Sequence, residues 1–146
     1  MRVLLTRPTF WLGAVIVIAL AGTYAALSWP SPASAETAPA PTAGVVRDVD
    51  VQELHAAANQ GAVVIDVREP HEFAAGRVPA SVLVPLATVL ARAGEFARDE
   101  TLYVICRTDN RSSTAAEALV SAGFSDVRNV RGGMVAWAAA GLPIER

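Results

Sequence analysis

A single cysteine begins a polar stretch that is rich in arginine. The stretch runs from Cys106 to Ser112 and reads Cys-Arg-Thr-Asp-Asn-Arg-Ser. The residues before it, 101–105, are apolar and rich in β-branched and aromatic side chains, which indicates a buried strand. The residues from 112 to 122 carry apolar side chains at helical spacing, and Gly123 follows them. We therefore expect the thiol at the carboxyl end of a strand, next to a helix N-terminus.

This position favours the ionised form of the thiol, which is the nucleophilic form. The unpaired N–H groups of a helix N-terminus attract anions, and Arg107 and Arg111 add two positive charges nearby. The alternative role for a lone cysteine is to fill the apolar core, which is common for this residue type. Because every residue from 107 to 112 is polar or charged, we interpret Cys106 as a nucleophile.

The spacing between the cysteine and the second arginine separates two kinds of chemistry. Cysteine loops that bind a phosphate commonly place the arginine after five intervening residues, whereas four separate Cys106 from Arg111. A smaller ring of backbone N–H groups suits a terminal sulfur atom better than a tetrahedral oxyanion. The spacing therefore favours sulfur transfer over phosphoryl transfer.

The loop and two flanking blocks resemble the rhodanese sulfurtransferases. The block before the loop is Val-Val-Ile-Asp-Val-Arg-Glu at 63–69 with the turn at 72–79, and the block after it is Arg-Gly-Gly-Met at 131–134 with Trp137 and Gly-Leu-Pro at 141–143. The three blocks cover most of residues 45–146. The resemblance implies an α/β fold, in which helices flank a central parallel sheet in three layers.

The resemblance also implies a function. Cys106 would be the catalytic residue and would carry sulfane sulfur as a persulfide, taken from a small anionic donor such as thiosulfate and passed to a thiol or to cyanide. The residues expected to bind the donor are Arg107, Thr108, Asp109, Asn110, Arg111 and Ser112. A non-catalytic sulfur carrier or binding module with the same fold remains the alternative.

One loop position departs from the family pattern. Rhodanese loops often have glycine where this chain has Asp109, so we expect a positive φ there, which aspartate tolerates better than most residues. Its carboxylate would repel an anionic donor unless it points outward or pairs with an arginine. Ser112 either donates a hydrogen bond into the loop or caps the following helix.

The remaining polar and aromatic candidates are interpreted as structural. We expect Arg68 to pair with a nearby carboxylate such as Asp66, and Trp137 to lie in the core. His55 and His71 are expected at the surface, and no His, Cys or carboxylate spacing matches a metal site. We predict no metal and no cofactor.

Composition limits the partners of the chain. The 146 residues include 12 basic residues, all of them arginine and scattered along the sequence, and 14 acidic residues, with a net charge of −2. We therefore expect no nucleic-acid partner. One cysteine excludes both an internal disulfide and a resolving thiol, so a persulfide must pass its sulfur to an outside acceptor.

Residues 1–35 have the layout of an export signal. Arg2 and Arg7 precede an apolar segment at 10–27, and Ala-Ser-Ala at 33–35 fits a cleavage site near Ala35. The segment is longer than a usual signal-peptide core of roughly 7 to 15 residues and nearly reaches the roughly 20 that span a bilayer. Cleavage and a membrane anchor formed by an N-terminal apolar helix both remain open, and either predicts an exported, periplasmic or extracytoplasmic domain. Residues 36–44 are expected to form a disordered Pro/Ala linker.

From residue 45 onward, strand-like and helix-like segments alternate, which predicts a parallel sheet covered on both faces. An Asp50-x-x-Glu53 capping box is expected to open the first helix. Strands are expected at 45–46, 62–67, 82–84, 101–105 and 126–130. Helices are expected at 50–60, in a short turn from 70, at 88–93, at 112–122 and after 133.

Overall fold

A computed structural model of the chain describes residues 44–146. The expectations for a signal peptide or membrane anchor at 1–35, and for all but the last residue of the linker at 36–44, fall outside these residues. Within the described range, none of the helices combines the length and the apolar character that crossing a membrane requires.

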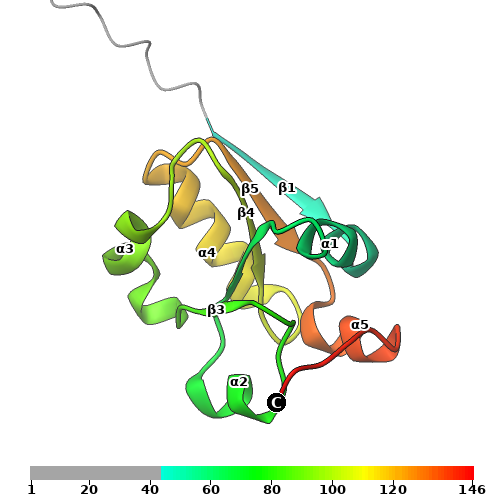
Figure 1. Ribbon diagram of the computed structural model, residues 1–146. Coiled ribbons are helices and arrows are strands. Elements are labelled where there is room, and N and C mark those ends of the chain that lie inside the picture. Colours follow the sequence, from blue (N-terminus) through cyan, green and yellow to red (C-terminus); the bar gives the residue numbers. More distant parts are fainter. Residues whose placement is uncertain (1–43) are drawn as a thin grey trace, which may run out of the picture. The chain divides into compact units, whose positions relative to one another are not determined.

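Five parallel strands form the sheet of the described domain, in the order β1-β5-β4-β2-β3 (Figure 1). The strands are β1 Val45–Val49, β2 Val63–Asp66, β3 Val82–Leu83, β4 Thr101–Ile105 and β5 Asp126–Val130. Because the strands run in the same direction, their carboxyl ends meet at one edge of the sheet. The central strand is β4, so the residues that follow it lie in the middle of that edge.

Helices cover both faces of the sheet. They are α1 Val51–Ala58, α2 Pro70–Ala75, α3 Val89–Arg92, α4 Asn110–Ser121 and α5 Gly133–Ala139, with 3-10 turns η1 Leu86–Thr88 and η2 Ala93–Glu95. Buried residues of α3 and α4 pack in one apolar cluster, and buried residues of α1 and α5 pack in the other. The predicted three-layer α/β fold is confirmed for residues 45–146.

The side chains of β4 alternate between these two clusters. Leu102 and Val104 lie in the cluster beneath α4, whereas Tyr103 and Ile105 lie in the cluster beneath α5. This is the two-residue period of a strand that is buried on both faces. The period continues past the end of the strand, so Cys106 falls on the α4 side.

Several element boundaries differ from the sequence prediction. Helix α4 begins at Asn110 rather than Ser112, and the helix expected at 88–93 is divided among η1, α3 and η2. Asp50 caps α1 as predicted, because its carboxylate accepts the N–H groups of Gln52 and Glu53 at 2.9 Å. The Glu53 carboxylate, however, accepts a hydrogen bond from Arg128, so no reciprocal capping contact to Asp50 is formed.

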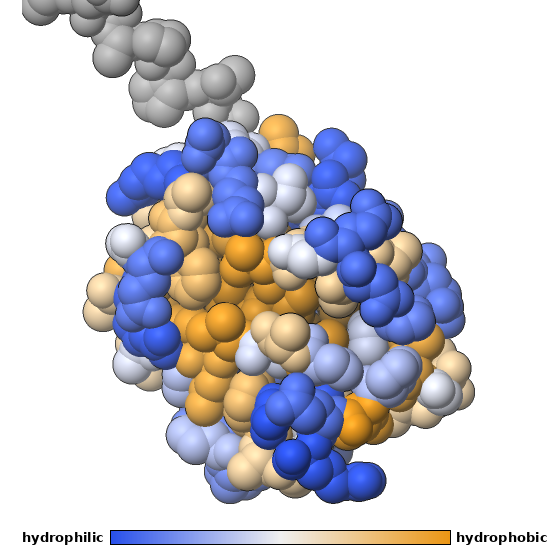
Figure 2. Space-filling view, in the orientation of Figure 1, coloured by the Kyte–Doolittle hydropathy of each residue, from blue (hydrophilic) through white to orange (hydrophobic). Residues whose placement is uncertain are grey.

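Exposed apolar side chains lie beside β3, the strand at one edge of the sheet. On the side of β3, apolar side chains gather on the surface between α3 and β3 (Figure 2). Leu90 in α3 is 56 % exposed and Val82 in β3 is 39 % exposed. This surface is separate from the carboxyl edge of the sheet, where α2 and α5 converge on the loop after β4 (Figure 1).

Candidate active site

The start of the loop after β4 is tied to the N-terminus of α5. The carbonyl oxygen of Cys106 accepts the Met134 N–H at 2.9 Å, and that of Arg107 accepts the Val135 N–H at 3.1 Å. Gly133 allows this approach, because a Cβ there would lie 2.4 Å from the Cys106 oxygen. The glycine has a φ of +52°, a left-handed conformation that other residues adopt at a cost.

The thiol lies at the base of the loop, beneath the first turn of α4. Cys106 is 1 % exposed and Ser112 is fully buried. Ser112 Oγ lies 3.4 Å from Cys106 Sγ and 3.0 Å from the Asp109 carbonyl oxygen, so its hydroxyl is within hydrogen-bond distance of two acceptors of the loop, as the first of its two predicted roles requires. Its hydroxyl does not occupy the capping position, because Asp109 precedes the helix instead.

The other predicted site residues are exposed to different degrees. Arg107, Thr108 and Asn110 are exposed, and Asp109 and Arg111 are half-buried. Within residues 44–146, the Arg107 guanidinium makes neither a salt bridge nor a side-chain hydrogen bond, so its charge is available at the rim of the loop. Of the predicted residues, Ser112 contacts the sulfur directly, and the roles of the others in donor binding stay predictions.

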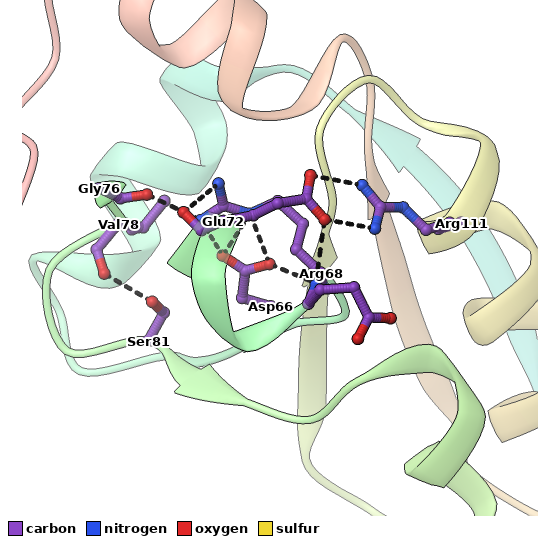
Figure 3. Close-up of polar contacts among 8 residues, drawn as sticks. Asp66, Arg68, Glu72, Gly76, Val78, Ser81 and Arg111 are labelled. Atoms are coloured by element: carbon purple, nitrogen blue, oxygen red, sulfur yellow. Dashed lines mark hydrogen bonds and ion pairs between the residues drawn. The ribbon is translucent and has the colours of Figure 1, made fainter. Parts of the chain in front are cut away.

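Arg111 is held by a carboxylate from α2, which the sequence analysis missed as a partner. Its two terminal nitrogens donate to Glu72 at 2.7 and 2.8 Å, a two-point contact that Figure 3 shows. The hydrogen bond from Arg111 lowers the pKa of Glu72 to about 2. The same contact raises the pKa of Arg111, with a smaller contribution from the charge of Cys106. Arg111 therefore stays charged beside the thiol, with much of its charge compensated.

Comparison with known proteins identifies the family. Residues 50–140 match the rhodanese-like domain. The chain belongs to this family. It is 33 % identical over 102 residues to a protein named sulfurtransferase from Allochromatium vinosum, covering 68 % of this chain and 95 % of that protein. It is 38 % identical over 86 residues to a thiosulfate sulfurtransferase GlpE from Pseudomonas syringae, covering 59 % of this chain and 81 % of that protein.

A solved structure supports the same assignment. The crystal structure of a rhodanese-like domain protein from Staphylococcus aureus aligns with a TM-score of 0.61 at 31 % identity, covering 68 % of this chain and 99 % of that one. The family and its named relatives support sulfur transfer as the general activity of this rhodanese-like domain.

The expectation about the backbone at Asp109 is wrong. Its φ is −173°, which is extended backbone open to any residue, so the aspartate causes no strain in the loop. Asp109 lines a polar cavity of about 340 Å³ together with Asp48, Asn129, Arg131 and two residues of the first turn of α4. Cys106 is not among the residues that line this cavity. Asp109 therefore borders a different space from the thiol.

Helix α2, which carries Glu72, is fixed by a buried ion pair at the end of β2. Arg68 donates to Asp66 at 2.6 Å, and both residues are buried. The same guanidinium donates to the backbone oxygens of Glu72 at 3.1 Å and Gly76 at 2.8 Å (Figure 3). The prediction of a structural role for Arg68 is confirmed. The pair holds α2 in place, and α2 in turn presents the Glu72 carboxylate to Arg111.

A second contact missed from the sequence lies behind Ser112. Ser112 Oγ lies 2.7 Å from Asn129 Oδ1, a second acceptor for its hydroxyl proton, and Asn129 Nδ2 donates to Asp48 Oδ1 at 2.8 Å. Asn129 is opposite Asp48 in the register of β1 and β5 and opposite Val104 in the register of β4 and β5. The sequence contained a signal for this placement, because Asn129 is two residues from Val127 in the predicted strand and so lies on the same face of the sheet as that valine.

Replacing Glu72 by glutamine is expected to lower the free energy of unfolding at neutral pH by about 1–2 kcal/mol. The pKa of Glu72 is depressed in the fold, so its stabilisation is complete above the ordinary value of 4.5 and is lost as pH falls toward about 2. The difference between the two proteins should therefore shrink between about pH 5 and pH 2. Urea unfolding of both proteins over this range measures it, and a difference independent of pH would contradict the assignment.

Proposed function

We propose that this rhodanese-like domain is a sulfurtransferase that moves sulfane sulfur through a persulfide on Cys106. The observation that supports this most strongly is the position of the chain's only thiol, which follows the central strand β4 and lies under the first turn of α4. The N-terminus of a 12-residue helix and the arginines at 107 and 111 favour a negative charge there. A persulfide carries such a charge on its outer sulfur.

The first step transfers sulfur from the donor to the enzyme. The Cys106 thiolate attacks the outer sulfur of thiosulfate, so a new S–S bond forms between that sulfur and Sγ. The bond between the two sulfur atoms of thiosulfate breaks, and sulfite leaves with the electron pair. Arg107, whose guanidinium has no ion-pair partner within residues 44–146, is suited to hold the dianionic donor and the departing sulfite.

The second step passes the sulfur to an acceptor. Cyanide attacks the outer sulfur of the persulfide, a C–S bond forms, the S–S bond to Cys106 breaks, and thiocyanate leaves. A thiolate acceptor reacts in the same way and leaves as a persulfide. Either acceptor restores the Cys106 thiolate, so the enzyme needs no reductant, and the absence of a second cysteine in the chain is consistent with this cycle.

Burial of the thiol limits which donors reach it. Because Cys106 is 1 % exposed, a donor contacts Sγ only after the side chains of the loop move apart. A small, narrow anion such as thiosulfate requires less opening than a bulky disulfide.

The burial of Cys106 also favours a second candidate, a non-catalytic module that carries sulfur or binds a partner. In such a module the loop would open only when a protein partner docks. The pairing of Arg111 with Glu72 favours the same alternative, because among the described residues only one of the two loop arginines, Arg107, is then left without an ion-pair partner for an anionic donor.

We also propose that the domain acts after export. Residues 1–35 combine early arginines, an apolar segment at 10–27 and a small-residue site near Ala35, which is the pattern of a signal peptide or membrane anchor. An exported domain would meet small acceptor thiols or a partner protein on the outer side of the membrane.

Steady-state turnover tests the proposed enzyme activity. The purified domain is supplied with thiosulfate and cyanide, and thiocyanate and sulfite are measured together. We expect both products in equal amounts, and no phosphate release from an aryl phosphate. Absence of both products, with a thiol acceptor as well as with cyanide, would favour the non-catalytic module. Phosphate release would instead support a cysteine phosphatase.

A further inference from the structure

A chain of hydrogen bonds connects the thiol to the surface through residues outside the loop. Ser112 Oγ lies 3.4 Å from Cys106 Sγ and 2.7 Å from Asn129 Oδ1. Asn129 Nδ2 donates to Asp48 Oδ1 at 2.8 Å, and Arg131 Nη1 donates to Asp48 Oδ2 at 3.0 Å. Asn129 is 4 % exposed, whereas Asp48 is exposed. The side chain of Asn129 is therefore largely shielded from solvent, although it borders the polar cavity described above, and Asp48 at the outer end of the chain contacts water.

Asp48 determines the orientation of the Asn129 amide. An ionised carboxylate only accepts hydrogen bonds, so the amide nitrogen must face Asp48 and the amide oxygen must face Ser112. The hydrogen bond from Asn129 lowers the pKa of Asp48, so this carboxylate is ionised at neutral pH. Because Asn129 Oδ1 has no proton, the Ser112 hydroxyl must supply the proton of their contact.

The Ser112 hydroxyl has one proton and three acceptors within reach. They are Asn129 Oδ1, Cys106 Sγ and the Asp109 carbonyl oxygen, which is 3.0 Å away. The Asp109 oxygen already accepts the Ser113 N–H at 2.9 Å. A thiolate would bind the proton strongly, because hydrogen bonds to charged acceptors are stronger than those to neutral ones. Donation to Sγ, however, leaves the buried Asn129 oxygen without a partner, which carries an energetic cost.

We propose that Asn129 is a positioning residue that restrains ionisation of Cys106 by competing with Sγ for the single proton of Ser112. The proposal rests on the proposed role of Cys106 as the nucleophile. It assigns part of the control of that nucleophile to β5 and β1, two strands that do not contribute to the loop. Asp48 acts through Asn129, because it holds the amide in the orientation in which the amide oxygen accepts the Ser112 proton.

The charged groups around the thiol do not change when Asn129 is replaced. They come from several elements: Arg107 and Asp109 from the loop, Arg111 from α4 with Glu72 from α2, the Asp66 and Arg68 pair at the end of β2, and Asp48 and Arg131 at the ends of β1 and β5. If replacing Asn129 changes thiolate formation, and the change requires Ser112, its cause is therefore the position of the hydroxyl proton and not the loss of a charge.

The ultraviolet absorbance of the thiolate, followed against pH, tests this proposal without any need for access to the buried sulfur. Cys106 is the only cysteine, so subtracting the titration of Cys106→Ser isolates its signal. We expect Asn129→Ala to lower the pH midpoint of thiolate formation by about 0.5–1 unit and Ser112→Ala to raise it by a similar amount. In a Ser112→Ala background, Asn129→Ala should produce no shift.

Asp48→Ala tests the same chain from the surface, where a substitution leaves the core intact. Without the carboxylate, the Asn129 amide can turn and donate to Ser112, which frees the hydroxyl proton for Sγ. The pH midpoint of thiolate formation should fall in Asp48→Ala. It should fall by less in the Ser112→Ala background, where the hydroxyl is absent and only the loss of the Asp48 negative charge acts. An equal fall in both backgrounds would overturn the proposal, as would an unchanged or higher midpoint in folded Asn129→Ala.

The titration is independent of turnover, so the two proposals fail separately. A protein that shows the Ser112-dependent shift but transfers no sulfur contradicts the sulfurtransferase function and retains the role of Asn129. A protein that transfers sulfur without this shift retains the function and excludes Asn129 as a positioning residue.

Discussion

Replacing Cys106 by serine is expected to reduce thiocyanate formation from thiosulfate and cyanide by at least about 1000-fold. A small stabilisation of the anionic form is enough to ionise a thiol but leaves a serine hydroxyl protonated. The serine therefore cannot attack the donor sulfur. The fold should tolerate the change, because serine is similar in size and Ser112 Oγ offers a hydrogen-bond partner to the new hydroxyl. Initial rates measured together with thermal unfolding separate lost chemistry from lost structure.

A relocated thiol provides the control for this variant. Ser113 follows Ser112 in α4. It lines the neighbouring polar cavity, whereas Cys106 lies at the base of the loop. The double variant with Cys106→Ser and Ser113→Cys places a thiol in the first turn of α4 instead of at the end of β4. We expect no recovery of sulfur transfer. Recovery there, or substantial turnover in Cys106→Ser alone, would show that the placement of the sulfur at the end of β4 does not determine the activity.

Replacing Gly133 by alanine is expected to lower sulfur transfer by about 100-fold although the residue never contacts the donor. Its Cβ would lie 2.4 Å from the Cys106 carbonyl oxygen and 2.7 Å from the Arg107 carbonyl, where ordinary contacts begin at 3.4 Å. The loop must therefore move away from α5, and the two hydrogen bonds from the Met134 and Val135 amides must lengthen. This displacement moves Sγ relative to Ser112 and to the arginines.

Gly141→Ala is the matched control for Gly133→Ala. Gly141 also has a left-handed φ, +67° against +52° for Gly133, but nothing lies within 4 Å of its Cβ position. Both substitutions carry a conformational cost of about 1–2 kcal/mol, which thermal unfolding measures. Only Gly133→Ala should also lose activity. Equal activity in the two variants would mean that contact with α5 does not position the loop.

The sheet and the loop are predictable from local sequence because each depends on neighbouring residues. The runs that became β2 and β4 are short and mostly apolar with β-branched side chains, which is what burial on both faces of a parallel sheet requires, whereas β5 carries only two valines among polar residues. The start of α4 was placed two residues late because its first turn is polar and carries no apolar period. The positive φ expected at Asp109 came from the family pattern, and the extended backbone of this chain does not need it.

The partners of the loop residues were not predictable in the same way, because they depend on contacts between distant segments. Glu72 precedes Arg111 by 39 positions, and Asp48 precedes Asn129 by 81. Their contacts arise only once the strand order places β1 beside β5 and α2 beside the end of β4. The sequence therefore predicts the loop that begins at Cys106, whereas the structure shows which side chains of that loop are already paired.

The mass of the intact protein after incubation with thiosulfate, with no acceptor present, tests the central claim most directly. We predict that the wild-type chain gains about 32 Da, the mass of one sulfur atom, and that cyanide removes the addition. Cys106→Ser should gain nothing under the same conditions. An unchanged mass in folded wild-type protein, or an equal gain in Cys106→Ser, would contradict a persulfide on Cys106.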